Sequence, residues 1–169
     1  LDVSLNDLVA LPAALCSLPE LESLLAHDNG LEALPVDFGN LHSLTNLDLS
    51  RNRLRELEVP LPSSLRSLRL AENELAHLPA FVLEGCGRLE VLHLAHNLLR
   101  ELPKELSLLG ELRELDLSHN RLRHLPPFSP GMASLRRLRL EHNRFREFPA
   151  APLDGLTTLT TLNLDGNPL

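Results

Sequence analysis

Three histidines recur at equal spacing in the second half of the chain, and imidazole is a common zinc ligand. They are His96, His119 and His142, with His93 nearby. If they stack on adjacent strands, their rings approach metal-ligand spacing, but the pattern fixes no neighbouring carboxylate to orient them. We therefore expect no metal site and no other cofactor, although protonation of the rings below roughly pH 6.5 would alter binding nearby.

Catalysis would require a nucleophile with a base, paired carboxylates in a pocket, or a phosphate-binding loop. The motifs G-x-G-x-x-G, G-x-x-x-x-G-K, C-x-x-C and G-x-S-x-G do not occur in the sequence. Asp116 and Glu141 are two of many acidic residues expected to face solvent, and a shallow open surface excludes little water. We therefore expect neither enzymatic activity nor a small-molecule substrate.

The composition narrows the class of partner. The net charge is −7, and residues 1–50 hold eight acidic residues and no Lys or Arg, whereas residues 51–169 hold fifteen acidic and sixteen basic residues. A protein that binds duplex DNA would need a surplus of basic charge, so we expect no nucleic-acid partner. No apolar run approaches the roughly 18 to 20 residues of a membrane span, so we expect no membrane insertion.

The elements that position these side chains come from a repeat that runs along the whole chain. Asparagine recurs every 21 to 24 residues, apolar residues stand eight, five and three positions before it and two and five after it, and proline often follows at the sixth position. The unit is LxxLxLxxNxLxxLP. The anchors are Asn6, Asn29, Asn52, Asn73, Asn97, Asn120, Asn143 and Asn167.

Each offset has a physical reason. Leu47 and Leu49 alternate with Asp48, which predicts a short strand with the leucines inward and the aspartate outward. Stacked units then form a parallel sheet with about 4.8 Å between strands. The asparagine amides can donate to and accept from unpaired backbone groups of adjacent coils, forming a ladder. Proline favours an extended entry into the return segment, from which leucines such as Leu106 and Leu109 point inward.

This pattern resembles the leucine-rich-repeat family, and the resemblance covers residues 1–169. It implies one α/β solenoid domain of about eight repeats, curved like a horseshoe, with a parallel β-sheet on the concave face. Short helical or 3₁₀ turns and loops are expected on the convex face. Because neither end shows an obvious polar cap, we expect the chain to be a fragment of a longer protein.

Two irregularities carry further expectations. The unit after Asn52 has only 21 residues, which leaves little room for a helix before the next strand. Cys86 stands where another unit has Leu156, so we expect it to act as a small buried hydrophobe. Cys16 lies three coils away, at least ~14 Å, so no disulfide between the two is expected.

The outward strand positions of successive units form columns, at four and at two residues before each asparagine, and repeat solenoids usually bind through such columns. No aromatic residue occurs in either column, so arginine must supply any dominant contact. The residues predicted to bind a partner are Arg69, His93, Arg113, Asp116, Arg136, Arg137, Arg139, Glu141 and His142. A solvated face whose charges neutralise one another is the equally open alternative.

A further column follows the strands. Arginines stand three residues after their anchors at Arg55, Arg100, Arg123 and Arg146, with Glu56, Glu101 and Glu147 beside them. Alternating charges at such a rim usually serve solubility, and a secondary docking edge is the alternative interpretation.

The function that follows is a protein–protein interaction module, serving as the recognition or scaffolding part of a signalling protein and binding through the concave face. Two alternatives stay open: an extracellular receptor or matrix-type ectodomain that recognises a protein ligand, and a structural spacer without a ligand. Extracellular members of the family usually carry cysteine-rich caps. Since none is visible, we expect a cytoplasmic location, with an extracellular one as the alternative.

Overall fold

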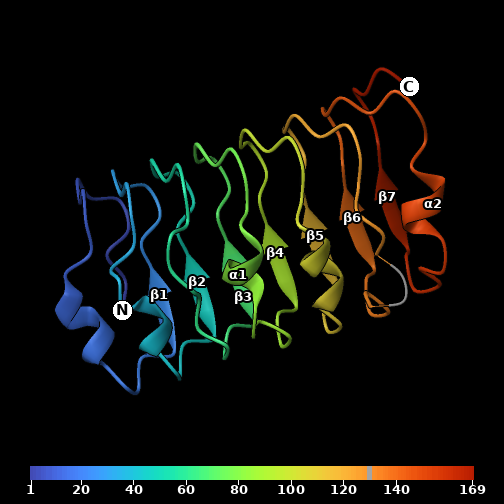
Figure 1. The fold of residues 1–169 in the computed structure, drawn as a ribbon. Helices are drawn as coiled ribbons and strands as arrows, with labels where there is room; N and C mark the ends of the chain where they lie inside the picture. Colours follow the sequence, from blue (N-terminus) through green and yellow to red (C-terminus); the bar gives the residue numbers. More distant parts are fainter. Residues whose placement is uncertain (129–130) are drawn as a thin grey trace.

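The computed structural model describes residues 1–128 and 131–169. One three-residue strand per repeat pairs in parallel with the strand of the next repeat, in the order β1 to β7 (Figure 1). The strands are β1 (Ser23–Leu25), β2 (Asn46–Asp48), β3 (Ser67–Arg69), β4 (Val91–His93), β5 (Glu114–Asp116), β6 (Arg137–Arg139) and β7 (Thr161–Asn163). The predicted parallel sheet is confirmed.

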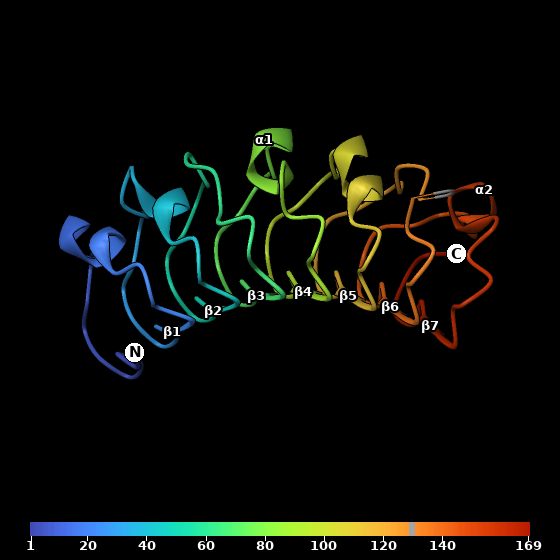
Figure 2. The same ribbon diagram turned by 90° about the horizontal axis from the view of Figure 1, so that it is seen from below.

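The return segments carry short helices on the side opposite the sheet. They are η1 (Ala13–Ser17), η2 (Phe38–Asn40), α1 (Ala80–Leu83), η3 (Lys104–Leu108) and α2 (Ala150–Leu153). Figure 2 shows the strands along the inside of a shallow arc and the helices spread along its outside. The chain runs directly from β2 to β3 without a helix, as the 21-residue unit predicts.

The core is a column of leucines between the sheet and the return segments. The central residues of all seven strands pair in register, from Leu24 to Leu162. Leu47 and Leu49 are fully buried, and so are Leu106 and Leu109 from the opposite side. The inward positions predicted from the repeat are therefore confirmed.

Proline begins most of the helical segments. Pro12, Pro79 and Pro103 directly precede η1, α1 and η3, each with extended backbone angles near φ −65° and ψ +143°. An extended proline without an N–H cannot continue a helix backwards, so it fixes where the return turn begins.

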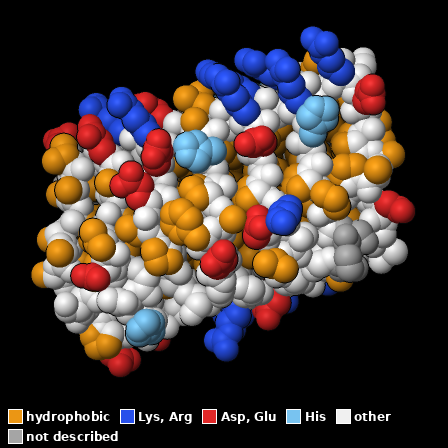
Figure 3. All heavy atoms as spheres, in the orientation of Figure 1, with side chains coloured by type: hydrophobic (Ala, Val, Ile, Leu, Met, Phe, Trp, Pro, Cys, Tyr) orange, Lys and Arg blue, Asp and Glu red, His pale blue; other side chains and the backbone are white. Residues whose placement is uncertain are grey.

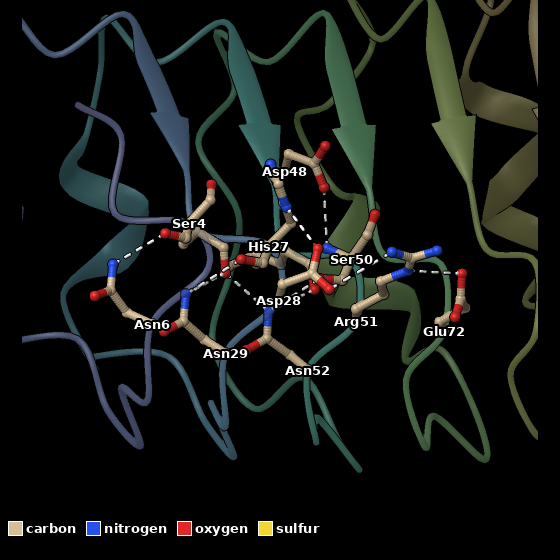
Figure 4. Close-up of polar contacts among 12 residues, drawn as sticks. Ser4, Asn6, His27, Asp28, Asn29, Asp48, Ser50, Arg51, Asn52 and Glu72 are labelled. Atoms are coloured by element: carbon tan, nitrogen blue, oxygen red, sulfur yellow. Dashed lines mark hydrogen bonds and ion pairs between the residues drawn. The ribbon is translucent and has the colours of Figure 1, made fainter.

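The asparagine ladder connects each coil to the one before it (Figure 4). In the unit of Asn52, the side-chain NH₂ donates to the carbonyl oxygens of Ala26 and Leu49 at 3.0 and 2.9 Å, and Oδ1 accepts from the Leu31 amide at 2.9 Å. The same pattern recurs at every later anchor through Asn167. The predicted ladder is confirmed.

The first repeat departs from the others. Eight units are present in the sequence, but the first adds only an isolated bridge between Asp2 and Leu25 beside β1. The side-chain NH₂ of Asn6 bonds only within its own unit, to the carbonyls of Val3 and Ser4. The bonds that later asparagines form with the preceding coil are therefore not formed by Asn6 within the described residues.

Both cysteines are buried free thiols. Sγ of Cys86 lies 3.9 Å from the Pro62 carbonyl oxygen of the preceding coil, and burial raises the pKa of the thiol to about 11. Burial, and then the charge of Asp37, also raises the pKa of Cys16. A thiol with a raised pKa holds little thiolate at neutral pH, so Cys86 behaves as the small hydrophobe predicted from its place in the repeat.

Candidate concave binding face

Three columns of side chains project from the concave face, one more than the sequence analysis predicted. Each strand spans the positions six to four residues before its asparagine, so the sixth position also faces outward. This additional column contains Ser23, Asn46, Ser67, Val91, Glu114, Arg137 and Thr161. Extending the two-residue alternation by one step would have found it.

Glu114 of β5 joins two of the predicted residues across three strands. Its Oε1 lies 3.2 Å from Nε2 of His93 on β4, and its Oε2 accepts from Nη2 of Arg137 on β6 at 2.7 Å. The side chain is only 16% exposed. Burial pushes the pKa of Glu114 up, but the hydrogen bonds from Arg137 and His93 outweigh burial and lower it. Glu114 therefore stays ionised and holds its two partners in place.

A second pair lies one column further along the strands. Nη1 of Arg139 lies 3.3 Å from Oδ2 of Asp116, whose other oxygen accepts from the amide and hydroxyl of Ser118 at 3.0 and 2.7 Å. Asp116 and Ser118 are both buried. Because Asp116 is buried and already accepts three hydrogen bonds, from Ser118 and Arg139, it has little capacity left for a partner.

Arg113 belongs to a third ion-pair network, at the edge where the strands begin. Its Nη1 lies 3.0 Å from Glu90, and Arg66 lies 2.7 Å from the other oxygen of the same carboxylate. Glu90 and Arg66 were not among the predicted residues. Their common position, seven residues before the asparagine, is the signal that could have identified them.

Besides His142, three predicted residues lie outside these networks. Among the described residues, Arg69 and Arg136 form no ion pair, and Arg136 is exposed. Oε2 of Glu141 is buried and has no hydrogen-bond partner within residues 1–128 and 131–169. A buried polar atom left unpaired is costly, and such atoms are rare in folded proteins. The sequence could not separate these three from the paired residues, because pairing depends on rotamers.

His142 belongs to a different column, formed by the residue directly before each asparagine. This residue adopts a left-handed conformation in every repeat, with φ between 53° and 56° in the first seven and 69° at Gly166. In the early repeats the column holds an ion-pair chain in which Arg51 lies 3.5 Å from Asp28 and 3.1 Å from Glu72 (Figure 4). His27 donates to Asp28, and this hydrogen bond is the largest cause that lowers the pKa of Asp28.

In the later repeats the same column becomes a stack of imidazole rings. The centroids of His96 and His119 lie 4.0 Å apart, and those of His119 and His142 lie 4.3 Å apart. The rings are inclined by only 10° and 25°, so their in-plane nitrogen lone pairs do not converge on one point. In the part of the chain that the structure describes, no group of three or more His, Cys, Asp or Glu side chains is placed to hold a metal ion.

The repeat signature also identifies the family. The family described as "Leucine rich repeat" matches residues 63–122 and 111–169, and a second description of the same repeat matches residues 43–68. These matches cover more than half of the chain. The chain belongs to the leucine-rich-repeat family. Its seven-stranded solenoid is the architecture that the sequence pattern predicts.

The leucine-rich-repeat chain is similar to curated proteins over part of its length. It is 48% identical to podocan-like protein 1 of Mus musculus over 66 residues, which is 39% of this chain and 12% of that protein. It is 36% identical to lumican of Coturnix japonica over 92 residues, which is 53% of this chain and 27% of that protein. The chain therefore aligns with about a quarter or less of the length of these relatives.

Two solved structures align with almost the whole repeat array. One is an octameric complex of latrophilin 3, Unc5D and the leucine-rich repeats of FLRT2, with a TM-score of 0.88, 31% identity, and coverage of 99% of this chain and 52% of that one. The other is a TLR13–ssRNA13 complex, with a TM-score of 0.79, 33% identity, and coverage of 90% of this chain and 22% of that one.

The predicted cytoplasmic location is wrong. Podocan-like protein 1, lumican and the FLRT2 repeats are extracellular or secreted leucine-rich-repeat proteins. The prediction rested on the absence of cysteine-rich caps. Such caps cover only the terminal layers of a solenoid, so the repeats themselves carry no signal for the compartment.

The comparisons do not support excluding nucleic acid, because one neighbour of this fold is in complex with single-stranded RNA. Protein is the partner in the FLRT2 complex. Among residues 1–128 and 131–169, no helix has the length and apolar character that crossing a bilayer requires.

Proposed function

We propose that this chain is a protein-recognition module of an extracellular leucine-rich-repeat protein, and that it binds its partner through the concave face of the sheet. One observation carries the proposal: this face holds charged side chains that take no part in joining the coils. The predicted binding residues Arg69 and Glu141 belong to this group on the outward strand positions, and Arg136 belongs to it at the edge where the strands begin.

The difference between paired and unpaired charges refines the predicted site. Arg137 and Arg139 hold the carboxylates of Glu114 and Asp116, so their charges are largely balanced within the sheet. Arg136 lies in the adjacent position without an ion pair among the described residues, and its side chain is exposed. An exposed, unpaired guanidinium can form a bidentate contact with a partner carboxylate without first breaking an internal pair.

Protein is the partner class that fits this surface best. The columns are open and lie along a shallow arc (Figure 2), and the outward side chains of β5 and β6 carry both signs of charge in register. An open face with fixed alternating charges favours a folded partner that presents complementary charges. The complex of the FLRT2 repeats with protein partners supports the same class.

The test uses the chain as bait in extracellular fluid, followed by identification of the captured protein and measurement of its affinity. The Arg136→Glu variant is expected to weaken binding by tenfold or more, with an unchanged unfolding midpoint, because no internal pair is lost. Arg88→Glu is the matched control, since Arg88 is exposed in the segment between α1 and β4 and forms no ion pair among the described residues. Equal affinity of both variants for the partner would show that Arg136 does not contribute to the binding site.

The same experiment separates the structural-spacer alternative. A spacer that only holds other domains apart should capture nothing reproducibly, and neither variant would then differ from the parent chain. Charge reversal at Arg137 or Arg139 is a poor probe, because it would place an acidic side chain against Glu114 or Asp116 and lower stability at the same time.

A further inference from the structure

A second charged surface lies on the edge of the solenoid where the chain turns after each strand. The residues one and three positions after the asparagines of repeats five to seven are mostly arginine. We call this set the arginine edge: Arg100, Arg121, Arg123, Arg144 and Arg146. Figure 3 shows Lys and Arg side chains gathered along this edge over the later repeats. In the first two repeats the same positions hold Asp7, Gly30, Val9 and Glu32, so the charge changes sign along the edge.

None of the five arginines forms an ion pair within the described ranges 1–128 and 131–169. Arg55 occupies the same column two repeats before Arg100, and there a glutamate in the next coil, Glu74, accepts from its Nε at 3.1 Å. For Arg100 and Arg123, the corresponding position of the next coil holds Arg121 or Arg144 instead, and for Arg146 it holds Pro168. The arginine edge therefore has an excess of positive charge that the neighbouring coils do not neutralise.

The backbone holds this edge in a fixed spacing. The amide of Arg121 donates to the Leu99 carbonyl at 2.8 Å, and the amide of Arg144 donates to the Leu122 carbonyl at 2.8 Å. Each coil is thus tied to the one before it, about 4.8 Å away. The like charges are held close together by the fold, which raises the attraction for an anion that can contact several of them.

The arginines border an apolar hollow. A hollow of about 510 Å³ lies between the turns of repeats six and seven and the start of α2. Arg123, Arg144 and Arg146 line one part of it, and Phe148 and Pro149 line another. Glu147 is the one acidic side chain in the lining, so the three arginines leave it with a net positive charge. The Phe148 side chain is 58% exposed, an unusual state for an aromatic residue in a chain with only five phenylalanines. Exposed apolar surface rimmed by charge is typical of a binding site.

We propose that the arginine edge binds an acidic peptide segment, whose carboxylates pair with the guanidinium groups and whose apolar side chain enters the hollow beside Phe148. Planar guanidinium groups match carboxylates in a bidentate geometry. The apolar hollow distinguishes this partner from a sulfated polysaccharide, which would use the charges and leave Phe148 uncovered. The proposal concerns a surface separate from the concave face and does not depend on it.

The test measures fluorescence anisotropy of a labelled peptide, EDEFEDE, titrated with the chain. A second peptide, EDESEDE, keeps the charge and removes the aromatic side chain, and a heparin hexasaccharide represents the polysaccharide class. The double variant Arg123→Glu with Arg146→Glu removes the central charges. Its matched control, Arg88→Glu with Lys104→Glu, makes the same change in net charge at exposed positions of the return segments.

We expect saturable binding of EDEFEDE that weakens by about tenfold or more in the double variant and stays unchanged in the control. EDESEDE should bind about tenfold or more weakly than EDEFEDE, since it lacks the phenylalanine side chain whose burial in the hollow removes apolar surface from water. Equal binding of the two peptides would refute the role of the hollow. Absence of saturable peptide binding, or heparin binding that alone depends on the arginine edge, would overturn the proposal.

Discussion

Replacing one asparagine of the ladder measures how much the repeat depends on it. Asn97 is 4% exposed, and its NH₂ group donates to the carbonyls of Leu70 and Leu94 at 2.9 and 3.1 Å. Its Oδ1 accepts from the Leu75 amide at 3.0 Å. An Asn97→Ala substitution removes all of these bonds, but the backbone groups that lose Asn97 differ in whether they keep another hydrogen-bond partner.

The two carbonyls keep a second donor. Leu70 still accepts from Asn73 at 3.1 Å, and Leu94 still accepts from Asn120 at 2.9 Å, because each of these carbonyls is shared by the amides of two adjacent repeats. The buried amide of Leu75 loses its acceptor. One orphaned donor costs about 1–3 kcal/mol, and the other lost bonds add about 1 kcal/mol. We therefore expect Asn97→Ala to lower the free energy of unfolding by about 2–4 kcal/mol.

Denaturant unfolding followed by circular dichroism measures this loss. Asn6→Ala is the matched control, because Asn6 donates only within its exposed first coil, and it should cost less than about 1 kcal/mol. Asn97→Asp keeps an acceptor for the Leu75 amide but turns a negative charge toward two carbonyls, so it should be at least as damaging as alanine at neutral pH. Equal stability of the Asn97→Ala and Asn6→Ala variants would refute the ladder argument.

Three further predictions concern titratable groups. Glu114 has a lowered pKa because hydrogen bonds from Arg137 and His93 outweigh its burial. Its contribution to stability is therefore lost as the pH falls from about 4.3 through the folded pKa. In the Glu114→Gln variant, the thermal unfolding midpoint should fall less steeply over this acidic range. His119 has a pKa lowered by burial and then by its two stacked neighbours, so stability should fall as the pH drops below about 6.5. His119→Asn, which tolerates the left-handed backbone, should reduce that fall in thermal melts. The Cys86 thiol, whose pKa burial raises to about 11, should react with Ellman's reagent near pH 8 far more slowly in the native chain than in denaturant, and equal rates would contradict its burial.

The leucine and asparagine positions could be predicted because the repeat leaves them one role each. Leu47 and Leu49 had to face inward, and Asn52 had to bridge coils, since no other assignment satisfies the backbone polar groups of a stacked turn. Likewise, the short unit after Asn52 predicted the missing helix.

The pairing of the surface charges could not be predicted in the same way. The repeat placed Glu114, Arg137 and His93 on neighbouring strands, but several side-chain rotamers are open to each of them at a strand surface. The structure selects the arrangement in which one carboxylate serves two cations. Predicting that choice requires the distances between side chains of neighbouring columns. The sequence pattern gives the column to which a residue belongs but not those distances.

The left-handed residue before each asparagine belongs both to the backbone of the repeat and to its charged surface. A positive φ is costly for most residues, and Asn, Asp, His and Gly tolerate it best. Five of the eight residues in this column are Asp, His or Gly, and the exceptions are Leu5, Arg51 and Glu72. His96, His119 and His142 fulfil this requirement, and their stacking follows from the coil spacing without a ligand. A feature that resembles a metal site in the sequence is therefore explained by the backbone, whereas the unpaired charges of Arg136 and the arginine edge satisfy no requirement of the fold. Neither Arg136 nor the arginine edge forms an ion pair with another coil among the described residues, so the variants at Arg136 and Arg123 test on the two surfaces separately whether these charges serve binding, as we propose.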